Sequence, residues 1–113
     1  MFKKALLELP DELITSATIQ QENGKKWLLE YYLTTCSTPS GNIFGIRVDK
    51  STLDGVLVER DSTSTTESQD EALAMIYTFA KGTVPPSTLI EMTDEWEWDG
   101  KPAPVLYQLQ AAS

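Results

Sequence analysis

The stretch TTESQDEALAMIYTFAKGTVPPSTLIEMTDEWEW, residues 65–98, carries the strongest local structural signals in the chain. Its apolar residues recur at helical spacing on both sides of the segment Lys81-Gly82-Thr83-Val84-Pro85-Pro86. This spacing predicts two consecutive helices with a joint from Gly82 to Pro86. The joint would set the angle between the helices, and so the shape of the surface that they form.

The first helix of this pair has a predicted start, an apolar face and an end. Either Thr66–Gln69 or Ser68–Glu71 matches the spacing of a capping box. Gly82 is placed to be the C′ residue, the first residue beyond the helix. The apolar stripe expected to face the core is Ala72, Leu73, Ile76, Phe79 and Ala80.

The second helix is expected to begin at Pro86, where a missing backbone N–H costs nothing. Asp99-Gly100 would end it. Ile90 is expected to face the first helix, and Trp96 is expected to be part of the core. The side of the helix that contains Trp96 consists of Leu89, Met92, Thr93 and Trp96.

The residues before this pair predict an antiparallel sheet. Pro10-Asp11-Glu12 is expected to break the N-terminal segment. Asn23-Gly24 predicts a type I′ hairpin turn, and Ser62–Thr66 reads as a polar linker. The expected strands alternate in polarity or are rich in β-branched residues; they are Leu13–Gln20, Lys26–Cys36, Ile43–Asp49 and Val56–Asp61.

The clearest of these strands, Lys26–Cys36, presents one continuously apolar face and one mixed face. The apolar face is expected to point into the core and consists of Trp27, Leu29, Tyr31 and Leu33. Leu28 and Tyr32 make the other face partly apolar. Either this face contacts another subunit, or these are single exposed apolar residues of the kind that are normal on a protein surface. Gly45 in the middle of the next strand indicates a bulge or the close approach of another backbone.

We therefore predict one α+β domain over residues 1–113, in which an antiparallel β-meander of three to five strands is covered on one face by two C-terminal helices. Residues 1–12 would form an N-terminal segment and residues 13–61 the sheet. Residues 66–98 would form the helical pair, and residues 99–113 a tail or arm.

Two parts of the chain resemble a known family. The segments Phe44-Gly45-Ile46-Arg47-Val48 and Val56-Leu57-Val58-Glu59-Arg60-Asp61 precede a helix with an acidic start. The Gly82–Pro86 joint and a second acidic helix follow. This order resembles a small domain-of-unknown-function family of bacterial proteins, found mainly among Firmicutes. The resemblance spans Trp27 to Trp98 and implies a compact bacterial domain without assigning any chemistry.

Charge restricts the classes of partner. The net charge of −8 argues against nucleic acid and against anionic membrane surfaces. Residues 62–99 hold eight acidic residues and one basic residue, so this region carries −7 of that total. No apolar run approaches the ~20 residues that span a bilayer, and the first apolar run is too short for a signal peptide. With a single cysteine, Cys36, these features lead us to expect a cytoplasmic protein.

The residue types present limit catalysis. The chain has no histidine, which removes Ser-His-Asp and Cys-His catalysis and the common zinc sites. Cys36 has no base beside it in the sequence and is expected to be an inert buried thiol. No glycine-rich phosphate loop is present. We expect a protein that is not an enzyme and that uses no cofactor.

Two sets of surface residues are candidates for contacts. Asp94, Glu95, Glu97 and Asp99 form an acidic contact patch in which helical spacing would make Asp94 a neighbour of Glu97, and Glu95 a neighbour of Asp99. The aromatic interface candidates are Tyr32, Trp98 and Tyr107.

The leading hypothesis is a non-catalytic interaction or regulatory protein of unknown role that forms a homodimer or another homo-oligomer. The alternative is a divalent-cation-dependent binder, or a small enzyme, that uses the acidic patch. A third hypothesis is that the acidic helices bind a basic protein partner.

Overall fold

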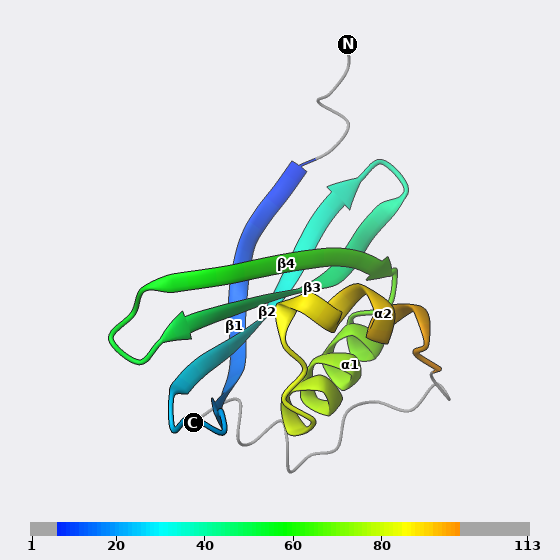
Figure 1. Cartoon of the computed structure of the whole chain (residues 1–113). Coiled ribbons are helices and arrows are strands. Elements are labelled where there is room, and N and C mark those ends of the chain that lie inside the picture. The colour runs from blue at the N-terminus through cyan, green and yellow to red at the C-terminus, as the bar shows by residue number, and fades with distance from the viewer. Residues whose placement is uncertain (1–6, 98–113) are drawn as a thin grey trace.

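The computed structural model describes residues 7–97, with side chains from residue 9 onward. In this part of the chain four strands are followed by three helical segments (Figure 1). The elements are β1 (Leu7–Gln20), β2 (Lys26–Thr38), β3 (Gly41–Thr52), β4 (Leu57–Thr66), α1 (Gln69–Lys81), the 3₁₀ helix η2 (Pro86–Thr88) and α2 (Leu89–Asp94).

The strands form one sheet in the order β1-β2-β3-β4, and each neighbouring pair is antiparallel. This is the predicted meander, and the helices lie against one of its faces (Figure 1). The α+β fold class is therefore confirmed. We call the face that carries Leu29, Tyr31 and Leu33 the helix face, and the opposite face the open face.

The Asn23-Gly24 turn joins β1 to β2, but its type differs from the prediction. Gly24 has φ 86°, whereas Asn23 has no positive φ. The Gly24 N–H donates to the Gln21 carbonyl, and the Gln21 N–H donates to the Lys25 carbonyl. This is a type I turn followed by a left-handed glycine, the usual geometry of a three-residue hairpin loop, rather than a type I′ turn.

Two segments predicted to be irregular belong to strands. Pro10-Asp11-Glu12 lies inside β1, because β1 is an edge strand where a missing N–H need not break a ladder bond. The register of β1 with β2 is also irregular between Leu9 and Glu12, so Pro10 lies where the ladder of hydrogen bonds is interrupted. The predicted linker Ser62–Thr66 is the second half of β4, paired with β3. Its threonines are favourable strand residues.

The core lies between the helix face and α1, and the predicted apolar face of β2 is confirmed. Leu29, Tyr31 and Leu33 are at most 3% exposed, and Trp27 is 8% exposed. From α1, the buried residues are Ala72, Met75, Ile76, Tyr77 and Phe79. The predicted stripe of α1 is confirmed in part, because Leu73 and Ala80 are only half-buried. Met75 and Tyr77, which the stripe did not include, are buried. Leu89 at the start of α2 is also fully buried, whereas Ile90 is half exposed and does not fill the expected space against α1.

The start of α1 follows one of the two predicted capping pairs. The Ser68 hydroxyl accepts a hydrogen bond from the Glu71 N–H at 3.2 Å. The Glu71 carboxylate does not complete the capping box. It accepts bonds from the Thr66 hydroxyl at 2.6 Å and from the Trp96 indole N–H at 3.0 Å. Glu71 therefore ties the end of β4 to the residues that follow α2.

The end of α1 is a Schellman motif shifted by one residue from the prediction. The Thr83 N–H donates to the Ala80 carbonyl, and the Val84 N–H donates to the Phe79 carbonyl. Thr83 is thus the C′ residue and has φ 51°, while Gly82 is the C-cap with φ −89°. Gly82 therefore lies one residue before Thr83, which is the residue with the left-handed backbone conformation.

The second helix is shorter than predicted, because α2 ends at Asp94 instead of continuing to Trp98. Glu95 is its C-cap, and its N–H donates to the Glu91 carbonyl. Trp96 still packs against the core, with its ring 5.9 Å from that of Phe79 in an edge-to-face arrangement. The expectation that Trp96 belongs to the core is confirmed, although Trp96 lies outside the helix.

Tyr31 gives a prediction for the pH dependence of stability. Its hydroxyl donates to the Val84 carbonyl at 2.9 Å in the core. Burial raises the pKa of Tyr31 well above its ordinary value of 10, and burial also raises the pKa of Tyr77. The unfolded chain therefore loses these protons first, so the free energy of unfolding should fall as the pH rises above about 10.

Tyr31→Phe should lower the free energy of unfolding at pH 7 by about 1–3 kcal/mol, because the buried Val84 carbonyl loses its donor. The same variant should show a shallower loss of stability between pH 10 and 11. Urea unfolding at several pH values measures both effects. An alkaline slope as steep as that of the wild type would show that Tyr31 is not the group responsible.

Candidate functional site

The open face of the sheet carries polar and charged side chains at its centre. Within residues 7–97 no helix packs on it, because the helices occupy the other face. Cross-strand pairing across β2, β3 and β4 places its residues in three successive rows. The rows are Thr34–Gly45–Ser64, Tyr32–Arg47–Ser62 and Glu30–Asp49–Arg60.

Two of these rows, together with β1, form a network of ion pairs. Arg47 Nη1 lies 2.6 Å from Asp11 Oδ2, and Arg47 Nη2 lies 3.3 Å from Asp49 Oδ2. Arg60 binds the same Asp49 carboxylate through two bonds, at 2.8 and 3.0 Å. The side chain of Asp49 is only 6% exposed. Two arginines thus compensate a carboxylate that would otherwise be costly to bury.

Arg47 is held at the centre of this network by an aromatic ring as well as by ion pairs. Its guanidinium carbon lies 3.9 Å from the centre of the Tyr32 ring, a cation–π contact. The hydrogen bonds from Arg60 to Asp49 raise the pKa of Arg60 further above its ordinary value. The network thus joins two arginines and two aspartates.

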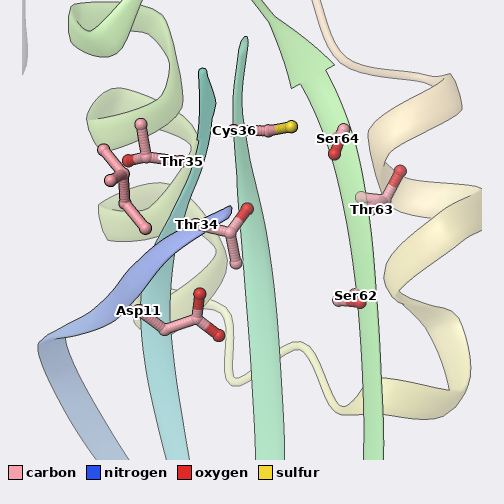
Figure 2. Close-up of a pocket in the computed structure, with 8 residues that line it drawn as sticks. Asp11, Thr34, Thr35, Cys36, Ser62, Thr63 and Ser64 are labelled. Atoms are coloured by element: carbon pink, nitrogen blue, oxygen red, sulfur yellow. The ribbon is translucent and has the colours of Figure 1, made fainter. Parts of the chain in front are cut away.

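A polar hollow lies on the open face beside this network. It has a volume of about 230 Å³, and the residues that line it are Leu9, Asp11, Thr34, Thr35, Cys36, Ser62, Thr63 and Ser64. Figure 2 shows Asp11, Thr34 and Cys36 on one side and β4 with Ser62 and Ser64 on the other. We call it the open-face hollow.

Gly45 explains why β4 comes so close to the neighbouring strands here. A Cβ atom at this position would lie 2.0 Å from the Thr63 carbonyl oxygen and 2.7 Å from the Ser64 Cα. The β3–β4 register is also irregular between Phe44 and Gly45. The prediction of a bulge or close backbone approach at Gly45 is therefore confirmed, and this approach brings Ser62–Ser64 to the hollow.

The predicted contact residues do not meet in one place. Tyr32 lies on the open face, half-buried beneath Arg47, so its ring is engaged within the chain. Asp94, Glu95 and Glu97 are exposed at and beyond the end of α2. Because the helix stops at Asp94, the helical spacing expected to make Asp94 a neighbour of Glu97 is absent. The pair Glu95–Asp99 stays a prediction. Trp98, Asp99 and Tyr107 lie outside the described residues.

The sequence contains a signal for the ion-pair network, although Arg47, Asp49 and Arg60 were not among the predicted contact residues. Arg47 and Asp49 are two apart on one strand, so they share a face, and Arg60 alternates onto the same face from the next strand. Opposite charges in neighbouring strands favour cross-strand pairing. The contact with Asp11 had no such signal, because Pro10–Glu12 was expected to be irregular.

Two observations bear on metals and membranes. Within residues 7–97, no three His, Cys, Asp or Glu side chains are arranged so that they could hold a metal ion. Among the helices of the same residues, none has the length and apolar character needed to cross a membrane.

Fold and site together define a small α+β domain: a four-stranded antiparallel meander with helices on one face and a charged, hollowed second face. Residues 11–98 match the family model DUF6514, described as a family of unknown function, and the chain belongs to this family. No curated protein and no solved structure matches the chain. The matched region begins at Asp11 and so includes the whole ion-pair network.

Proposed function

We propose that this chain is a non-catalytic interaction protein that pairs with a second copy of itself along the edge of β1, through Thr15–Gln20. The observation that carries the proposal is the contrast between this uncharged segment and the charged first halves of β1 and β4. The second half of β4, Ser62–Thr66, is also uncharged, but η2 and α2 pack against β4. An edge strand presents unpaired N–H and C=O groups, and proteins usually protect such an edge with charges, prolines or bulges.

The edge formed by β4 carries charges that oppose self-pairing. Glu59, Arg60 and Asp61 are consecutive in the strand. Residues directly opposite each other in an antiparallel pair must share a face. A pair centred on Glu59 would place that residue against its own copy. A pair centred on Arg60 would oppose the two arginines and set Glu59 against Asp61, and like charges directly opposite destabilise a strand pair.

The two halves of β1 differ in charge and in how regularly they pair with β2. The first half contains Pro10, Asp11 and Glu12, and its register with β2 is irregular at two places. The second half, Thr15–Gln20, has the sequence TSATIQ, carries no charge and pairs with β2 without interruption. Centred on Ala17, self-pairing would place Ser16 opposite Thr18 and Thr15 opposite Ile19, all uncharged.

The charge of the whole protein supports the same site. Two copies that each carry −8 repel one another, so contact is least costly where both surfaces are uncharged. The helix-face residues Thr15, Ala17 and Ile19 are half-buried in the single chain. Pairing would bury them further and continue the sheet into the second copy.

The double variant Ser16→Lys/Thr18→Lys tests the proposal, because both side chains are exposed and lysine on an edge blocks pairing. Sedimentation equilibrium of the full chain should give twice the chain mass of 12.6 kDa for the wild type and a single chain mass for the variant. Far-UV circular dichroism checks that the variant stays folded.

Val58→Lys is the matched control, since Val58 is 52% exposed on the other edge strand. It should leave the dimer intact. Dissociation by Val58→Lys alone would assign the interface to the apolar β3–β4 hairpin, where Leu53 and Val56 are also exposed. A single chain mass for the wild type at all accessible concentrations would overturn the proposal.

The proposal extends to where the protein works. The resemblance to a bacterial family and the single cysteine support a bacterial cytoplasmic setting. The −7 charge of residues 62–99 supports a basic protein as a further partner of the dimer, bound at the helical side.

A further inference from the structure

We propose that the open-face hollow binds a small organic cation that carries N–H donors, of the size of an alkylammonium ion. The inference rests on the chemistry of the lining and is independent of self-association. The lining contains one carboxylate, hydroxyl side chains from β2 and β4 and one thiol, but no lysine or arginine.

The polar atoms that point into the hollow lack partners of their own. Within residues 7–97, the side chains of Thr34, Ser62 and Ser64 make no hydrogen bond, and neither does that of Cys36. These groups come from β2 and β4, which lie on either side of β3, and Gly45 of β3 has no side chain between them. Three unused hydroxyl oxygens around one small space can accept hydrogen bonds from a single donor-rich ligand.

Asp11 supplies the charged end of the site. Its Oδ2 atom is bound by Arg47, and Oδ1 has no hydrogen bond within the described residues. Arg47 is in turn held by Asp49 and by the Tyr32 ring. The free carboxylate oxygen is therefore fixed in position before a ligand arrives, which lowers the cost of ordering the site on binding.

These features select a cation over an anion. No positive side chain lines the hollow, and the net charge of −8 raises the local concentration of cations. An ammonium group can donate three hydrogen bonds, to the carboxylate and to hydroxyls. The Asp11 side chain is 27% exposed, so water weakens its ion pair with the ligand, and we expect a dissociation constant of about 1–10 mM.

Titration of the ¹⁵N-labelled full chain with ethanolamine at pH 7 tests this site. The backbone amides of Thr34, Cys36, Ser62 and Ser64 should shift and saturate in the millimolar range. Ethanolamine should also slow alkylation of Cys36 by iodoacetamide, since the thiol lines the same space. Ethylene glycol and sodium acetate at equal concentration should do neither.

Thr34→Val removes one acceptor while preserving the shape of the side chain, and should weaken ethanolamine binding about tenfold. Thr78→Val, the same substitution on the exposed side of α1, is the control and should leave binding unchanged. The absence of saturable shifts would overturn the site. Equal shifts with ethylene glycol, or shifts of the same amides with acetate, would overturn its selectivity for a cation.

Discussion

Replacing Gly45 with alanine is expected to lower the free energy of unfolding by about 3 kcal/mol or more. The added Cβ would lie 2.0 Å from the Thr63 carbonyl oxygen and 2.7 Å from the Ser64 Cα. Both are backbone atoms of the paired strand β4, so relief requires that β4 move away. The φ of Gly45 is not positive, which makes the close approach, and not backbone conformation, the reason for a glycine here.

Gly82→Ala is the matched control for this substitution. At Gly82 the nearest atom to an added Cβ is the Thr78 carbonyl oxygen, at an ordinary 3.7 Å, and φ is −89°. Alanine should therefore be neutral there or stabilising by about 0.4–1 kcal/mol. Urea unfolding of both variants measures the difference. A Gly45→Ala protein as stable as the wild type would mean that β4 does not pass so close to β3.

Asp49→Asn is expected to cost about 2–3 kcal/mol, because it removes the charge that compensates both Arg47 and Arg60. The cost stays below that of isolating a buried charge completely, since Arg47 keeps Asp11 and the Arg60 side chain is 49% exposed. The free energy of unfolding from urea denaturation at pH 7 measures it.

Glu59→Gln is the control for the loss of one negative charge, because Glu59 has no ion pair within residues 7–97. It should change stability by less than about 0.5 kcal/mol. A double-mutant cycle of Asp49→Asn with Arg60→Gln should show a coupling above about 0.5 kcal/mol. If Asp49→Asn lowered the free energy of unfolding as little as Glu59→Gln, the ion pairs of Asp49 would not stabilise the fold.

The hollow depends on the close approach at Gly45, and the ion-pair network borders it. Gly45 lets β4 come close to β3, and no side chain stands between Thr34 of β2 and Ser64 of β4 in the row that Gly45 occupies. The ion pair between Asp11 and Arg47 then holds the first half of β1 against the same region. A variant at Gly45 should therefore disturb the hollow as well as the stability. Asp49→Asn should act on both as well, because Asp49 holds the Arg47 side chain that binds Asp11.

Local pattern was enough to predict the sheet, its apolar face and α1. Alternation along β2 placed Leu29, Tyr31 and Leu33 in the core because side chains of a strand alternate between faces. The apolar stripe and the Ser68 cap located α1, because apolar residues spaced three and four apart lie on one face of a helix. These periodicities are properties of neighbouring residues, so no tertiary information is needed to recognise them.

What the sequence by itself determined is therefore the class of fold and the core face of β2, together with the absence of histidine and the acidic charge of residues 62–99. Only the tertiary structure decided that Pro10 sits within an edge strand, that α2 ends at Asp94, and that Asp11 meets Arg47 across 36 residues. The physical reason is that the place of a strand in the sheet, the end of a short helix and a contact between side chains of two strands depend on the packing of the whole chain. All three arise from contacts between residues distant in the chain, which composition and spacing do not encode.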